Sequence, residues 1–418
     1  MLSKTKLSNG ITVASDYTNE IDSVSINISM KVGSRNETIE NNGISHFIEH
    51  MLFKGTKKRT AKEIANAFED IGAISNAYTS KENTCYYAKV LNEYSKKCFE
   101  ILADILQNPT FDETETERER NVILQELAMS KDTPDDIITD YYNETAFSKQ
   151  AYGMPIIGSE QNIKSFTKND FIKYRKENYV GKNLFITSTG NLTHEKLLEY
   201  IDKYITKINN KDIEDIQKAE YIGGYFFKKK KLEQVQCLIG FKGFSYVDDN
   251  YYKNYIFNHI LGGSMSSRLF QEIREKQGLC YTIYSSNTPT YETGSFDIYT
   301  AIEPANIEKT ISAIIKEIKN FEKHPIVKEE FERAKIKIKS SILMQFENIG
   351  YRSSNLLHSI MIKDKLPSKK EIIEKIENTK IEDLIEILES IINSKPTLAI
   401  YGNVEEKNYY DLLLDSLK

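Results

Sequence analysis

The 418-residue chain has no tryptophan, only six histidines and four cysteines, and no long apolar segment. The cysteines form no CxxC pair and share no metal-type spacing with the histidines, so each is expected to be a small buried residue. The first ten residues hold no apolar core of a signal peptide, and no window approaches the roughly 18 apolar residues of a membrane span. These absences predict a cytoplasmic chain without a membrane partner.

A strong charge of either sign is also missing. The chain has 56 Lys and Arg residues against 61 Asp and Glu, a net charge of −5. A nucleic-acid-binding surface needs a clear basic excess, so no nucleic-acid partner is expected. The one basic run, 228–231, follows three aromatic residues and is expected to be a solvated strand or linker edge, not a nucleic-acid patch. The length and the ordinary hydrophobic fraction of 40% predict two or three folded domains.

Segments of the second half resemble segments of the first at a nearly constant offset. Gly190 corresponds to Gly402 (402 − 190 = 212), and Glu119 corresponds to Glu332 (332 − 119 = 213). These offsets are close to half the chain length, which indicates two diverged copies of one domain of about 200 residues. We expect a zinc-binding catalytic domain over residues 1–212. A degenerate repeat domain that contributes substrate-binding residues is expected over residues 220–418.

Each copy mixes alternating strand patterns with amphipathic helices. Thr60 and Glu63 form a capping-box pattern at the start of a helix that Gly72 ends, and residues 73–90 then alternate like a strand. The predicted fold class is therefore α+β, with two homologous domains that each pack helices on a mostly antiparallel sheet.

Two of the six histidines lie in the segment HFIEH. His46 and His50 are four residues apart, so on a helix they share one face and can point at one ion. Glu49 lies beside them. This HxxEH pattern is the reverse of the HExxH zinc helix, and both place a carboxylate next to metal-activated water. A catalytic zinc site also needs a third protein ligand.

The candidates for that ligand are Glu119 and Glu126, which are seven residues apart and fall on one helical face. Glu126 is preferred because it sits inside an apolar run, where an unpaired carboxylate is costly. Glu119 would then orient a ligand from the second layer of the site. Without the histidines, two solvated glutamates would be the better interpretation. In the second copy Lys339 takes the place of Glu126, so we expect one metal ion per chain, held by the first half.

The motif, a glutamate 76 residues after its second histidine (126 − 50 = 76), and the duplicated chain resemble the pitrilysin/insulinase zinc metallopeptidases. The resemblance covers nearly the whole chain and is greatest to bacterial relatives of the mitochondrial processing peptidase beta subunit. It implies Zn²⁺ bound by His46, His50 and Glu126, with Glu49 as the general base of peptide hydrolysis.

The resemblance also implies how a peptide is held. Family members close two such chains, or one doubled chain, into a clamshell in which the peptide adds to a sheet edge. The corresponding strand starts at Asn76 and Ala77, and an ordinary edge strand is the alternative. An arginine and a tyrosine seven residues apart match Arg274 and Tyr281 in IREKQGLCY. They would stabilise the oxyanion in trans, whereas without the resemblance Arg274 would be a surface helix residue.

In the processing peptidases, two acidic residues receive an arginine near the cleavage point, and an aromatic residue lines the adjoining pocket. Phe53, Asp136 and Asp140 fall at those places. Asp136 and Asp140 share a helical face suited to a guanidinium, although a negative first helical turn explains them nearly as well. The glycine-rich loop of the partner alpha subunits is not evident, which favours a homodimer over a heterodimer with a related chain.

The expected function is a zinc endopeptidase that cleaves short unfolded or presequence-like peptides. The alternative is a non-catalytic core or assembly subunit of a processing-peptidase-like complex, and a metal-buffering protein is a further one. The physiological substrate is not visible in the sequence.

Overall fold

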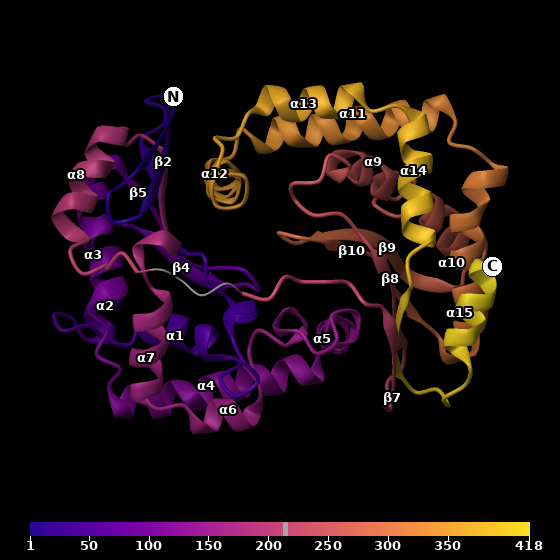
Figure 1. The fold of residues 1–418 in the computed structure, drawn as a ribbon, viewed down its shortest axis with the longest axis horizontal. Coiled ribbons are helices and arrows are strands. Elements are labelled where there is room, and N and C mark those ends of the chain that lie inside the picture. The colour runs from indigo at the N-terminus through magenta and orange to yellow at the C-terminus, as the bar shows by residue number, and fades with distance from the viewer. Residues whose placement is uncertain (212–215) are drawn as a thin grey trace. The chain divides into compact units, whose positions relative to one another are not determined.

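The computed structural model describes residues 1–211 and 216–418, so the expected end of the first domain, residue 212, lies outside the described residues. The chain forms two compact units (Figure 1). Unit 1 comprises Met1–Met129, Met154–Gln217 and Met344–Pro367. Unit 2 comprises Ser130–Gly153, Lys218–Leu343 and Ser368–Lys418.

Unit 1 contains a six-stranded sheet in the order β1-β2-β6-β3-β5-β4. All neighbouring strands are antiparallel except β2 and β6. Its strands are β1 (Leu2–Lys6), β2 (Thr12–Tyr17), β3 (Ser23–Met30), β4 (Ile74–Thr79), β5 (Thr84–Leu91) and β6 (Leu184–Gly190). Its helices are α1 (Ile44–Leu52), α2 (Ala61–Glu69), α3 (Ser95–Gln107), α4 (Glu113–Asp132, whose last residues belong to unit 2), α6 (Glu160–Ser165), α7 (Lys168–Asn178), α8 (His194–Tyr204) and α12 (Ile349–Lys363).

Unit 2 contains a five-stranded sheet in the order β7-β11-β8-β10-β9, again antiparallel except for one pair, β7 and β11. Its strands are β7 (Gly224–Lys229), β8 (Val235–Lys242), β9 (Cys280–Pro289), β10 (Gly294–Ile302) and β11 (Thr397–Gly402). Its helices are α5 (Pro134–Ala146), α9 (Tyr251–Leu261), the π-helix η5 (Phe270–Lys276), α10 (Ile307–Lys323), α11 (Lys328–Gln345, whose last residues belong to unit 1), α13 (Lys369–Asn378), α14 (Ile381–Ile392) and α15 (Tyr409–Leu417).

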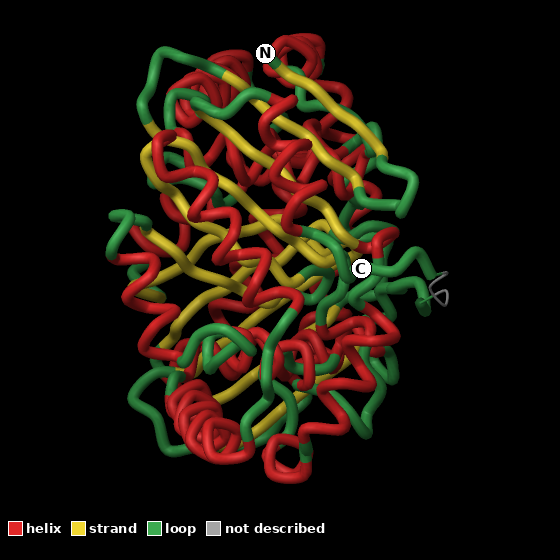
Figure 2. Tube along the Cα trace, turned by 90° about the vertical axis from the view of Figure 1, so that its left-hand side faces the viewer, coloured by secondary structure: helices red, strands yellow, loops and turns green. Residues whose placement is uncertain are grey.

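The two sheets have the same strand pattern, apart from β1, which has no counterpart among the described residues of unit 2. Figure 2 shows the strands, in yellow, flanked by helices, in red. The predicted α+β class, with two homologous halves built on mostly antiparallel sheets, is confirmed. The capping box of α2 is also observed, since the Thr60 N–H donates to Glu63 Oε2 (2.7 Å) and the Glu63 N–H donates to Thr60 Oγ1 (3.3 Å). All four cysteines are buried and free, as expected.

Each unit takes one helix from the other half of the chain. The α5 helix, which follows α4, packs on β8 and β11 of unit 2, and α12, which follows α11, packs on β2, β3 and β6 of unit 1 (Figure 1). The Tyr142 hydroxyl of α5 donates to the buried Asp297 carboxylate on β10. A side chain at Gly240 on β8 would collide with the Tyr142 ring, so the close approach of α5 requires glycine there.

None of the helices in the described ranges combines the length and the apolar character needed to cross a membrane.

Candidate metal centre

The α1 helix positions the two histidines of the HFIEH segment. It starts after Gly43, whose φ of 99° favours glycine. No side chain caps this helix at Gly43; instead the carboxylate of Glu37 accepts hydrogen bonds from the N–H groups of Gly43 and Ser45 (both 2.8 Å). Burial raises the pKa of Glu37 to about 7, even though these hydrogen bonds lower it. One face of α1, with Phe47 and Ile48, is fully buried in the core of unit 1. The histidines lie on the other face.

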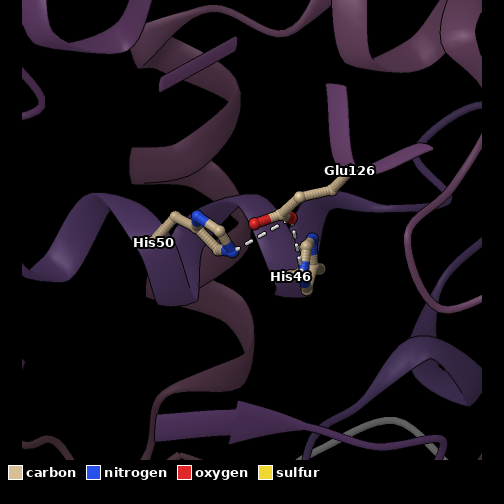
Figure 3. A group of neighbouring side chains, drawn as sticks. All are labelled: His46, His50 and Glu126. Carbon is tan, nitrogen blue, oxygen red and sulfur yellow. Dashed lines mark ion pairs between the residues drawn. The ribbon is translucent and has the colours of Figure 1, made fainter. Parts of the chain in front are cut away.

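His46, His50 and Glu126 come together in unit 1, where each is half-buried (Figure 3). One ligand atom from each lies within 4.8 Å of the other two. Glu126 Oε2 is 3.6 Å from His50 Nε2 and 3.9 Å from His46 Nε2. The two rings come from adjacent turns of α1, and the carboxylate reaches them from α4. No other group of three such residues with this geometry occurs in ranges 1–211 and 216–418.

This arrangement fits a zinc ion. Protein ligands about 2.1 Å from tetrahedral zinc lie roughly 3.4 Å from one another. The nitrogen-to-oxygen distances of 3.6 and 3.9 Å are close to that value. Two imidazoles and one carboxylate are also a donor set of known catalytic zinc sites, which leave the fourth position for water.

The two imidazoles differ in their protonation. Burial lowers the pKa of His46 to about 3, and the charge of the neighbouring His50 contributes to this shift. His46 is therefore neutral, and its lone pair is free to bind a metal. Burial also lowers the pKa of His50, but the hydrogen bond to Glu119 and the charges of Glu126 and Glu49 together raise it above its ordinary value. The site is therefore electrostatically prepared for positive charge.

Glu119 lies behind His50. Its Oε1 is 2.8 Å from His50 Nδ1, and its Oε2 forms an ion pair with Lys54 (2.6 Å). Burial raises the pKa of Glu119, but these two cationic partners outweigh it and hold the pKa below its ordinary value. A carboxylate at Nδ1 directs Nε2 toward the cluster.

Glu126 is not the buried carboxylate that its place in an apolar run of the sequence predicts, so that prediction is wrong. The side chain of Glu126 is 37% exposed, while that of Glu119 is only 5% exposed. Glu126 joins the cluster because it faces both Nε2 atoms, and Glu119 can be buried because His50 and Lys54 compensate its charge.

Glu49 is buried beside the cluster. Burial raises its pKa, and a hydrogen bond from Thr79 Oγ1 to Oε2 (2.5 Å) opposes that effect. Thr79 is the last residue of β4, so this contact joins the helix to the edge strand. Sequence reasoning did not single out Thr79. The only signal was its place two residues after Ala77, which puts both on one face of the strand.

The strand β4 is the edge of the unit 1 sheet and packs against α1. Asn76 and Ala77 pair with Tyr87 and Tyr86 of β5. The Ala77 N–H donates a hydrogen bond to the side-chain oxygen Oδ1 of Asn76 (2.8 Å). A peptide that pairs with this N–H must displace the Asn76 side chain. Phe53, at the end of α1, packs against the core with its ring 6.2 Å from that of Tyr86.

Arg274 and Tyr281 lie next to each other in unit 2. Arg274 Nε donates to the backbone carbonyl of Tyr281 (2.8 Å), and its guanidinium lies 5.2 Å from the Tyr281 ring centroid. Tyr281 is 76% exposed. The structure thus joins the two residues, on η5 and at the start of β9, and leaves the tyrosine open to solvent.

Asp136 and Asp140 are one turn apart on α5, near its start at Pro134. The α5 helix belongs to unit 2 and not to the unit that holds the histidines. The structure therefore does not bring these carboxylates together with the metal cluster or with Phe53 inside one unit.

Two family models match the chain, and several known proteins resemble it. The models are "Insulinase (Peptidase family M16)" over residues 12–160 and "Peptidase M16 inactive domain" over residues 165–338. A Rickettsia bellii protein named as an uncharacterized zinc protease is 39% identical over 95% of this chain and 96% of its own length. The mitochondrial-processing peptidase subunit beta of Neurospora crassa is 30% identical over 96% of this chain and 88% of its own.

Two solved structures have the same fold as this chain. The structure of a Helicobacter pylori protease superposes with a TM-score of 0.89 at 22% identity, covering 96% of this chain and 99% of that one. A chain of complex III from Candida albicans superposes with a TM-score of 0.85 at 19% identity, covering 99% of both chains.

Fold and cluster together define a class, the α+β proteins with two similar units, one of which carries an inverted HxxEH helix and a distal glutamate. Within that class, this chain belongs to the insulinase family, peptidase family M16.

Proposed function

We propose that this chain is a zinc endopeptidase that cleaves short unfolded or presequence-like peptides. The observation that carries the proposal is the convergence of His46, His50 and Glu126 beside the buried carboxylate of Glu49. The names of the relatives, which include zinc proteases and processing-peptidase beta subunits, support it. The cytoplasmic location expected from the sequence stays a prediction.

His46, His50 and Glu126 would hold one zinc ion, and Glu119 would fix the orientation of His50. Bound zinc would supply Lewis acidity, which lowers the pKa of water to about 7 and polarises a peptide carbonyl. Glu49 then acts as general base, because its carboxylate lies next to the metal ligands and Thr79 holds it in place. In the second half of the reaction Glu49 donates the proton to the leaving amine.

The exposed edge of β4 would bind the peptide by backbone hydrogen bonds, which gives affinity with little sequence preference. Arg274 and Tyr281 would bind the peptide and stabilise the oxyanion, since Tyr281 is exposed and Arg274 lies against it. In a homodimer we propose that they serve the metal centre of the partner subunit. Asp136 and Asp140 would receive an arginine side chain of a presequence-like peptide, and Phe53 would line a pocket for another side chain of that peptide.

The test is mass-spectrometric mapping of products from a panel of arginine-containing peptides, with the zinc-loaded wild type and Glu49→Gln compared. We expect Glu49→Gln to keep its zinc, by metal analysis, and to lose cleavage by about 100-fold or more, because the general base is removed. Cuts clustered after arginine would support the acidic pocket. Full activity in Glu49→Gln would overturn the assignment of the base, and zinc binding without any cleavage by the wild type would favour the non-catalytic subunit.

A further inference from the structure

A second site candidate in unit 1 is a pocket of about 570 Å³ that shares no residue with the metal cluster. It lies between one face of α7, the end of α3 with the loop after it, and the segment that follows α8. Its lining residues are Lys57, Gln107, Pro109, Thr110, Phe111, Lys168, Ile172, Arg175, Lys176, Tyr179, Val180, Lys207, Ile208 and Asn209.

The charge of this pocket is one-sided. Five of the fourteen lining residues are cationic and none is acidic, although the whole chain has more acidic than basic residues. The cations are Lys57, Lys168, Arg175, Lys176 and Lys207. Among the described residues no carboxylate forms an ion pair with any of them, and Lys207 Nζ donates instead to the neutral Asn108 Oδ1. Like charges gathered in this way repel one another unless an anion binds among them.

Arg175 carries the deepest of these charges. Its guanidinium lies over two aromatic rings, 5.7 Å from the centroid of Phe111 and 5.3 Å from that of Tyr179. Its acceptor among the described residues is the backbone carbonyl of Leu106, and its Nε is buried without one. Burial lowers the pKa of Arg175, so the protein environment itself disfavours the charge. A buried cation without a carboxylate costs folding free energy, which a bound anion would offset.

Hydrogen bonds of Gln107 join two of the segments that line the pocket. Gln107 Nε2 donates to the carbonyls of Ala103 (3.0 Å) and Tyr204 (2.7 Å), and Gln107 Oε1 accepts from the N–H groups of Thr206 and Lys207 (both 2.9 Å). Gln107 thereby ties the segment after α8 to the end of α3. The α7 residues that line the pocket follow the spacing of a single helical face, which Tyr179 continues directly after the helix. They are Lys168, Ile172, Arg175 and Lys176.

We propose that this pocket binds a small phosphate-bearing anion with an apolar portion. Four exposed lysines line the pocket together with Arg175. Guanidinium and ammonium groups are the donors that proteins use for phosphate. Phe111, Ile172 and Tyr179 supply an apolar surface beside the charges. A concave site of this volume suits a small molecule, whereas an extended surface is needed for a nucleic acid or a lipid bilayer.

The test is calorimetric titration of the full-length protein with tripolyphosphate and with inorganic phosphate. Lys176→Gln/Lys207→Gln removes two charges from the rim of the pocket, and we expect it to weaken tripolyphosphate binding by about tenfold or more. Lys173→Gln is the matched control because Lys173 is exposed on the same helix but does not line the pocket. Its affinity should stay within about twofold of the wild type.

All three proteins keep the same metal-binding residues, so any binding of phosphate at a metal ion is equal in them. If the wild type binds tripolyphosphate more tightly than inorganic phosphate, the ligand carries several phosphate groups. If it binds the two anions equally, the ligand carries a single phosphate group. Both outcomes support the site. Arg175→Gln, checked for folding by its thermal unfolding, should lose binding as well. The proposal is overturned if neither anion binds the wild type, or if Lys173→Gln weakens binding as much as the double variant does.

Discussion

At the scale of single residues, the hydroxyl of Thr79 is the group that holds Glu49. Thr79→Val removes this donor and keeps the shape of the side chain, so Glu49 loses its fixed orientation. We expect kcat for peptide cleavage to fall by roughly tenfold, the value of one hydrogen bond to a charged group, with zinc content and thermal stability unchanged. Thr79→Ser, which restores the donor, should recover most of the rate. Equal rates in the Val and Ser variants would show that the hydrogen bond plays no part.

Glu119 controls His50 in a comparable way. Glu119→Gln weakens the hydrogen bond to His50 Nδ1 and removes the charge that Lys54 pairs with. We expect zinc affinity to fall by about 10- to 100-fold, measured by competition with a chelator. Glu113→Gln provides the control, because Glu113 is exposed in the first turn of the same helix. The role assigned to Glu119 is wrong if both variants bind zinc as the wild type does.

Much of this centre is predictable from the sequence because its geometry is local. The spacing of His46, Glu49 and His50 on one helix predicts that their side chains lie close together. The helical pattern before Leu127 limits the third metal ligand to two glutamates. Thr79 and Glu37 are not predictable in this way. Each acts through contacts between segments separate in sequence, and neither residue type is unusual in its surroundings.

At the scale of elements, Glu37 accepts hydrogen bonds from the start of α1 and makes the stability of the fold depend on pH. Its pKa rises from 4.5 to about 7 in the folded protein, so the folded state binds more protons than the unfolded state between those values. The free energy of unfolding therefore falls as the pH rises through this range, by an amount on the order of 3 kcal/mol. Glu37→Gln does not titrate and should lack this slope.

Urea unfolding at pH 5 and pH 8 measures the effect. We expect Glu37→Gln to gain stability relative to the wild type when the pH changes from 5 to 8. A difference between the two proteins that is the same at both pH values would contradict the assignment of this titration to Glu37.

The part of the fold that the internal repeat covers was predictable from the sequence. Two copies of the same strand and helix pattern predict two similar sheets, and the structure has them. The placement of α5 and α12 was not predictable. An amphipathic pattern shows that one face of a helix is buried, but it does not show which sheet covers that face. For α5 the decisive feature is the Tyr142 ring against Gly240, a contact between residues about a hundred positions apart.

At the scale of the whole molecule, the question is which chain supplies Arg274 and Tyr281 to a given metal centre. If a homodimer forms and these residues act in trans, a dimer of one Glu49→Gln chain and one Arg274→Ala chain has one intact site. That site combines Glu49 of the second chain with Arg274 of the first. Co-expression with two different tags allows such mixed dimers to be purified, and we expect about half of the wild-type activity, since one of two sites is complete.

Dimers of either variant alone should be inactive. A mixed dimer of Glu49→Gln with His46→Ala is the control, because both changes affect the same half of the chain and leave neither site complete. If Arg274 and Tyr281 instead serve the metal centre of their own chain, the first mixed dimer is as inactive as this control. Failure to recover any doubly tagged species would reject the homodimer itself, because closed two-fold assembly of identical chains must produce mixed pairs when two variants are made together.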